Sequence, residues 1–193
     1  VGFRPDLVWI KNRSGQHSWS WCDSATQGKY LKTNSTDGDA FSDDVFRGMS
    51  QLGFNIGSSS RVNNTGDNIS AFSWKAGGPT YVTNNDGSTT SYVSANTTAG
   101  FSIIKYTGNG TAGATVGHGL NSAPEMIVCK LCDGNGFNWI VWHRDIGTGK
   151  YLELNTSQAY QNQSSYNMFN STAPTDSVIT LGSIANTNNN TNA

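Results

Sequence analysis

Hydrophobic and polar positions alternate in short runs along this chain, and the runs predict β strands. Trp19 and Trp21 share one face of a run whose other face carries serines, which is the pattern of a half-buried strand. Residues 7–11 are apolar on both faces, so they predict a central strand covered on both sides. Turn clusters rich in Asn, Gly and Asp, such as residues 63–67, separate the runs. The pattern favours an all-β fold, with one short helical turn expected over residues 43–49.

The N-terminal stretch of the chain is repeated in its second half. Residues 5–11, Pro-Asp-Leu-Val-Trp-Ile-Lys, reappear at residues 124–130 as Pro-Glu-Met-Ile-Val-Cys-Lys. A tryptophan-bearing run follows each copy, and then Gly-Lys-Tyr-Leu follows at residues 28–31 and 149–152. Because three motifs recur in the same order at nearly constant spacing, we interpret them as one duplicated structural unit.

The duplication predicts two tandem β-sandwich modules of jelly-roll or lectin-like type. Residues 1–77 would form the first module and residues 100–193 the second. Residues 78–99 would form a hairpin inserted between them, although their composition also permits a flexible linker. The strand predicted over residues 69–74 has no counterpart in the second copy, and the strand over residues 101–106 has none in the first. We therefore expect a piece of a longer tandem array, or a chain whose open sheet edges are filled by neighbouring subunits.

Charge and composition narrow the classes of partner. The chain has 193 residues, of which only 13% are charged, and its formal net charge is −1. The few basic residues are scattered, so we expect no nucleic-acid partner. No apolar run approaches the roughly 20 residues that a membrane helix requires, so membrane insertion is not expected. Partners would be recognised by shape and hydrogen bonds.

Cysteine and acidic motifs give no prediction of a cofactor or metal. The three cysteines, Cys22, Cys129 and Cys132, fit neither a paired disulfide framework nor a four-ligand zinc site, and we interpret them as structural thiols. Asp37 and Asp39 flank a glycine as in part of a calcium loop, but the glutamate that completes such a loop is absent. Calcium bound by this acidic loop is the alternative.

Several stretches together resemble a known repeat. Residues 3–14, 57–67 and 73–77 are similar to a repeat module of structural proteins in tailed phages, particularly those of marine bacteria and cyanobacteria. Residues 106–110 and 117–125 resemble the next repeat of the same kind. The resemblance implies a β-sandwich module in a tail fibre, spike or other exterior virion appendage, often beside carbohydrate-binding-like domains. It implies no catalytic or ligand-binding residues.

Catalysis is not expected from the side chains present. His143 and Asp145 are two residues apart and would share a strand face, but no nucleophile accompanies them. Acidic residues for glycoside cleavage are candidates by type alone. We therefore predict a non-enzymatic protein.

Six tryptophans in a weakly charged chain suggest glycan recognition, because aromatic rings stack on sugar faces and nearby polar groups bind hydroxyls. The candidate ligand-binding residues are Trp21, Trp139, Trp142 and His143. The alternative for Trp142 is a place in the core, and Trp9, Trp19 and Trp74 are predicted to be core residues in the same way.

The combined prediction is a virion structural protein, part of a tail fibre or spike, that contributes to host attachment. Its partners would be other virion proteins, copies of itself and a host-surface glycan. By analogy with appendages, the copies would form a trimer. The alternatives are a capsid decoration or head-fibre protein, or a glycan-binding or glycan-degrading module. Specificity for a ligand would lie where the copies differ. These places are residues 12–16 of the first copy, the corresponding residues 131–136 of the second, and the inserted hairpin.

Overall fold

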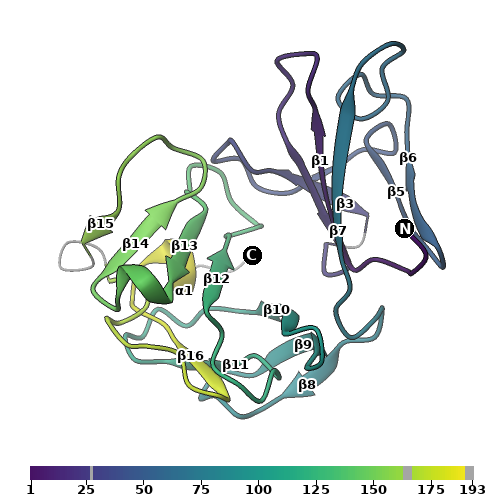
Figure 1. Ribbon diagram of the computed structural model, residues 1–193. Helices are drawn as coiled ribbons and strands as arrows, with labels where there is room; N and C mark the ends of the chain where they lie inside the picture. The colour runs from purple at the N-terminus through teal and green to yellow at the C-terminus, as the bar shows by residue number, and fades with distance from the viewer. Residues whose placement is uncertain (27, 163–166, 190–193) are drawn as a thin grey trace.

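A computed structural model describes residues 1–26, 28–162 and 167–189, and strands dominate it (Figure 1). The described helical segments are one 3-10 turn, η1 (Arg144–Ile146), and one short helix, α1 (Ala185–Asn188). The predicted all-β class is confirmed. Within the described residues, neither helical segment is long and apolar enough to span a membrane.

The first copy of the repeat forms a five-stranded antiparallel sheet. In spatial order its strands are β4 (Ala40–Phe41), β3 (Lys29–Lys32), β2 (Ser20–Asp23), β1 (Leu7–Asn12) and β7 (Ile69–Trp74). Alternation along β1 turns Val8 and Ile10 into the core, while Trp9 and Lys11 lie on the opposite, outer face. The predicted central position of this strand is confirmed, but the predicted cover on both sides is wrong, because Trp9 and Lys11 on the outer face are only partly buried.

A hairpin of β5 (Phe46–Ser50) and β6 (Gly53–Ile56) completes the core of the first copy. Val45 and Phe46 are buried against residues of the inner sheet face. The helical turn predicted over residues 43–49 is wrong beyond its first residues. The amides of Val45 and Phe46 both donate to Ser42 O, and the chain then enters β5. Pairing with β6 and burial of Phe46 override the local preference for a turn.

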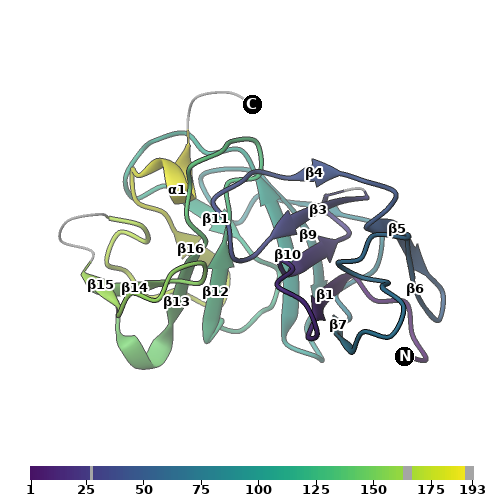
Figure 2. The ribbon, with the colours of Figure 1, turned by 90° about the horizontal axis from the view of Figure 1, so that it is seen from above.

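The inserted segment forms a hairpin that is extended by one more strand. β8 (Val82–Asn84) pairs with β9 (Ser91–Asn96), and β9 also pairs with β10 (Phe101–Tyr106). This three-stranded sheet lies between the two copies in Figures 1 and 2. It connects them in space as well as in sequence.

The second copy repeats the strand order of the first. Its four-stranded sheet runs β12 (Met126–Cys129), β13 (Ile140–His143), β14 (Lys150–Glu153), β15 (Gln161–Asn162). β16 (Val178–Thr180) pairs with β11 (Thr115–Gly117). Its core contains Trp142, Tyr151 and Phe169, where the first copy has Cys22, Tyr30 and Phe46.

Hydrogen bonds around one asparagine recur in both copies. Asn63 Nδ2 donates to Gly57 O at 3.0 Å, and Asn188 Nδ2 donates to Gly182 O at 2.7 Å. Each glycine packs so closely on a neighbouring chain segment that a Cβ would overlap backbone atoms. Both glycine amides donate into the segment that carries the buried Phe46 or Phe169, at Val45 O and Met168 O respectively. The sequence duplication therefore has a structural counterpart at the level of single hydrogen bonds.

Candidate functional site

Two of the predicted ligand-binding tryptophans meet where the two copies touch. The indole rings of Trp21 and Trp139 lie 5.3 Å apart between centroids. Trp139 is only 1% exposed, and its Nε1 donates to Lys32 O at 3.1 Å. Trp21 is half-buried and donates from Nε1 to the Asp23 carboxylate at 2.8 Å. These indoles therefore connect the copies.

Backbone bonds extend this contact, which we call the join: residues 32–39 of the first copy against residues 130–139 of the second. Asp39 N donates to Cys132 O at 2.9 Å, and Gly136 N donates to Thr36 O at 3.0 Å. The Lys130 ammonium caps three carbonyls, those of Thr36, Leu131 and Phe137. Its partial burial lowers the Lys130 pKa.

The other two predicted site residues lie elsewhere. Trp142 is 4% exposed within the core of the second copy, and its Nε1 donates to Gly147 O. His143 caps η1, where its Nδ1 accepts from Asp145 N at 3.2 Å. The four candidates are thus not gathered into one site, and the buried rings of Trp139 and Trp142 have no free face for a sugar. For Trp21 and His143 a binding role stays a prediction.

The tryptophans expected in the core take the half-exposed positions instead. Trp9, Trp19 and Trp74 are all only partly buried. Trp9 packs between Trp19, at 5.0 Å between ring centroids, and Trp21, at 5.6 Å, with the rings tilted or edge-on to one another. These three indoles form a cluster because Trp9 and Trp21 are opposite residues on β1 and β2, on the outer face of the sheet. The assignment of rings to core and surface from the sequence is therefore corrected in both directions.

Beside this cluster lies a depression of about 350 Å³ that we call the Trp19 hollow. Its lining residues come from β1, the following loop and β7: Lys11, Arg13, Trp19, Ser70 and Phe72. The antiparallel register places Ser70 opposite Lys11 and Phe72 opposite Trp9. The Phe72 side chain is half exposed, and the Lys11 ammonium lies 6.0 Å from the centre of the Trp19 ring. The hollow thus combines two aromatic rings with two cationic side chains and a hydroxyl.

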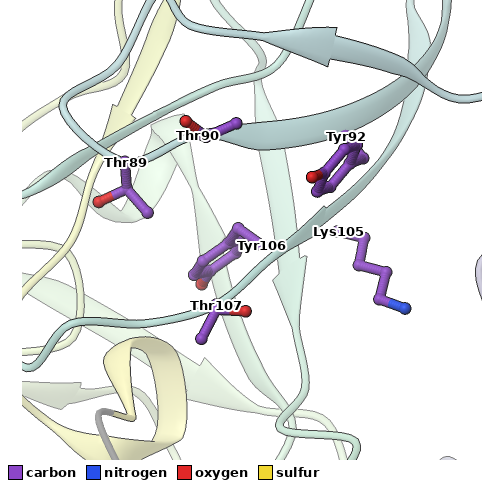
Figure 3. Close-up of a pocket in the computed structure, with 6 residues that line it drawn as sticks. All are labelled: Thr89, Thr90, Tyr92, Lys105, Tyr106 and Thr107. Atoms are coloured by element: carbon purple, nitrogen blue, oxygen red, sulfur yellow. The ribbon is translucent and has the colours of Figure 1, made fainter.

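A second depression, of about 310 Å³, lies on the three-stranded sheet of β8, β9 and β10, which we call the linking sheet (Figure 3). It is lined by Thr89, Thr90, Tyr92, Lys105, Tyr106 and Thr107. The Tyr106 hydroxyl lies within hydrogen-bond distance of Thr187 O and Cys129 Sγ, and burial raises the Tyr106 pKa. That hydroxyl is engaged inside the protein, so the exposed Tyr92 ring and the threonine hydroxyls form the accessible part.

The described side chains do not form a cluster of three or more His, Cys, Asp or Glu with metal-binding geometry. The three cysteines in the same part of the chain are free thiols, and burial raises the pKa of each, that of Cys132 to about 12. Asp37 and Asp39, the acidic pair of the calcium alternative, form ion pairs with Lys32 and Lys29. Lysine ammonium groups occupy the carboxylates that a cation would need.

Sequence patterns had not indicated the hollows. The Trp19 hollow depends on β1 pairing with β7, which lies some 60 residues later in the chain. Alternation along β1 and β7 does place Lys11 with Trp9 and Ser70 with Phe72. Only the pairing register brings the two faces together.

Comparison with known proteins identifies one family. The chain matches, over residues 1–193, a family described as a domain of unknown function, DUF7483. No curated protein and no solved structure matches it.

Proposed function

The chain belongs to this DUF7483 family, and we propose that it is a non-enzymatic structural protein of a phage virion, in a tail fibre or spike that contributes to host attachment. The observation that carries this proposal is the duplicated unit with its repeated hydrogen bonds at Asn63 and Asn188. Repetition of one unit is a device of extended structural proteins. The appendage role itself comes from the resemblance of residues 3–14 and 57–67 to phage repeat modules.

In this proposal each copy is one β-sandwich module of jelly-roll or lectin-like type. The support is that each copy has its own hydrophobic core and its own sheet in the same strand order. The join connects the two modules through buried Trp139 and two backbone hydrogen bonds. A stiff connection of this kind suits a protein that must hold a binding surface away from a particle.

Host attachment would use the Trp19 hollow. Aromatic rings with nearby hydrogen-bond donors suit glycan binding, and the ammonium of Lys11 with the guanidinium of Arg13 would favour an acidic sugar. Repeated weak contacts along an appendage would gain avidity without a deep pocket. This moves the proposed ligand contact from Trp139 and Trp142 to Trp19 and Phe72.

Location on the particle tests the structural role. Immunogold labelling of purified phage particles that carry this chain should place the label on the tail appendage. A label over the capsid shell would support the alternative of a decoration protein. Particles without any label would refute a virion role altogether.

A glycan array of bacterial surface polysaccharide fragments tests the attachment role. We expect binding of acidic glycans that falls about fivefold or more in Phe72→Ala, because stacking on one ring contributes on the order of 1 kcal/mol or more. The matched control is Tyr92→Ala, an equally exposed ring on the linking sheet. Equal affinity in both variants would exclude the Trp19 hollow, and release of reducing ends from any polysaccharide would contradict the non-enzymatic assignment.

A further inference from the structure

The two copies differ at one sheet edge. In the first copy β1 lies between β2 and β7 and pairs with both. In the second copy β12, the counterpart of β1, pairs within the described residues with β13 alone. No strand of the described residues occupies the position at β12 that corresponds to β7. An unpaired strand edge carries backbone donors and acceptors in position to pair with another strand.

Equivalent side chains on β1 and β12 are buried to different degrees. Leu7 at the start of β1 is 2% exposed, whereas its counterpart Met126 on β12 is 54% exposed. Val8 is fully buried in the first core, but its counterpart Ile127 is only partly buried. Apolar side chains of β12 are thus exposed to water at positions where the equivalent side chains of β1 are buried.

The first copy also shows what such a strand contributes. β7 pairs with β1 along its full length, from Trp74 opposite Leu7 to Ile69 opposite Asn12. The Ile69 side chain packs against the first core. Two backbone bonds extend the pairing, from Asp6 N to Trp74 O and from Arg13 N to Asn68 O. On β1 the pairing spans six residues in antiparallel orientation, and the shorter β12 offers four of the equivalent positions.

We propose that the open edge of β12 binds a strand of the β7 type that belongs to another copy of this repeat. The occupant is a repeat strand because, within the first copy, that copy's own β7 occupies the equivalent edge of β1. Another copy can donate its β7 only by releasing it from its own β1. The pairing register follows from the alignment of the copies. A Trp74-type residue lies opposite Met126, a Phe72-type residue opposite Val128, and an Ala71-type residue opposite Cys129. This is strand addition at a sheet edge.

This inference does not rest on the appendage role. It concerns how one repeat completes another and holds whether the array belongs to a fibre, a capsid or another assembly. Failure of the labelling experiment on phage particles would leave it standing. Its own failure would likewise leave the location of the protein on the particle untouched.

The test adds the missing strand in trans. A synthetic peptide with the sequence of residues 68–76, Asn-Ile-Ser-Ala-Phe-Ser-Trp-Lys-Ala, is titrated into the isotope-labelled 193-residue chain. We expect saturable binding, slower amide hydrogen exchange in β12, and intermolecular contacts between the peptide alanine that corresponds to Ala71 and Cys129. The matched control peptide is N-methylated on the amide of the residue that corresponds to Phe72, which faces the partner strand in the β1–β7 pairing, so it lacks a ladder donor and should not bind.

Two results would overturn the proposal. One is the absence of any change at β12 at millimolar peptide. The other is protection that appears at β1 instead, since the peptide would then have exchanged with β7. The variant Met126→Lys, at an exposed position that tolerates charge, should lower the peptide affinity severalfold because it removes the apolar partner of the peptide tryptophan.

A covalent version removes the dependence on peptide affinity. Ile69 follows Asn63 by six positions, and the same spacing from Asn188 places a copied strand directly after Ala193. A chain extended there by Ile-Ser-Ala-Phe-Ser-Trp should gain about 3 °C or more in Tm, compared with a chain extended by the same residues in scrambled order. Equal Tm values for the two extensions, with unchanged exchange at β12, would refute the proposal.

Discussion

Asn188 holds several chain segments together through one buried side chain. Its Nδ2 donates to Gly182 O and to Thr111 O, while its Oδ1 accepts from the amides of Asn109 and Gly110. The equivalent Asn63 is exposed, and its side chain is bonded at Gly57 O. The same residue type in the same place therefore contributes differently, because the second copy is preceded by strands that the first copy lacks.

Replacing this asparagine should destabilise the protein more in the second copy than in the first. We expect Asn188→Ala to lower the free energy of unfolding by about 3 kcal/mol, because several buried polar partners lose their bonds. Asn63→Ala should lower the free energy of unfolding by about 1 kcal/mol, since a single hydrogen bond of an exposed side chain is lost. Urea denaturation followed by circular dichroism measures both, with the exposed Asn162→Ala as the control. A cost for Asn188→Ala no larger than that of the control would contradict the role assigned to it.

His118 is a buried group that ties stability to pH. Its Nδ1 accepts from Leu120 N at 3.2 Å, so Nε2 carries the proton and donates to Thr175 O, also at 3.2 Å. Burial lowers the His118 pKa below its usual value near 6.5. The unfolded chain therefore takes up a proton at a higher pH than the folded one. The stability linked to His118 is complete above about pH 6.5 and declines as the pH falls towards the lower folded-state pKa.

Thermal unfolding between pH 7.5 and 5.5 tests this linkage. The wild type should lose stability on acidification, with a contribution from His118 of at most about 1.4 kcal/mol per pH unit. His118→Gln should show a flatter dependence on pH than the wild type. An unchanged slope in His118→Gln would show that other groups account for it.

At the scale of elements, the join depends on the absence of one side chain. A Cβ at Gly38 would lie 2.5 Å from Cys132 O and 3.0 Å from Gly134 O, closer than atoms can approach. The equivalent position in the second copy, nine residues after Lys150 as Gly38 is nine after Lys29, carries Ala159. That methyl group would keep an equivalent loop at a greater distance. A further repeat would therefore dock less closely on the second copy than the second docks on the first.

Substitution at this glycine is a direct test of the join. Gly38→Ala should destabilise the chain by about 1–3 kcal/mol and change the near-UV circular dichroism of the Trp21–Trp139 pair, because the two loops must move apart. The control is Gly149→Ala, where a Cβ meets no atom within 4 Å and stability should hold or rise slightly. Identical behaviour of the two variants would show that the join tolerates the extra atom.

Elements with strong local patterns were predictable from the sequence. Alternation marked β2, and the apolar run marked β1, because their side chains report directly on burial. The two-residue strands β4 and β15 are too short to carry a pattern, and β5 was obscured by turn-forming residues before it. For these strands, pairing with a partner distant in sequence determines the conformation.

At the scale of the whole molecule, the duplication was readable from the sequence, but the roles of the tryptophans were not. Periodicity shows which residues share a face but does not show which face another part of the chain covers. Trp139 is buried where it meets Trp21 and Lys32 of the other copy, while its counterpart Trp19 lies at the edge of a hollow. Tertiary contacts therefore give different environments to two residues that are equivalent in the sequence repeat.

The contact between Trp21 and Trp139 gives this molecule a built-in optical probe. Both indoles sit at the boundary between the copies, and the Trp139 ring is shielded from water by the partner copy. Separation of the copies would hydrate that ring and shift its emission to longer wavelength, without unfolding either core. Intrinsic fluorescence can therefore distinguish hinge-like opening between the copies from loss of the fold within one of them, with no attached dye.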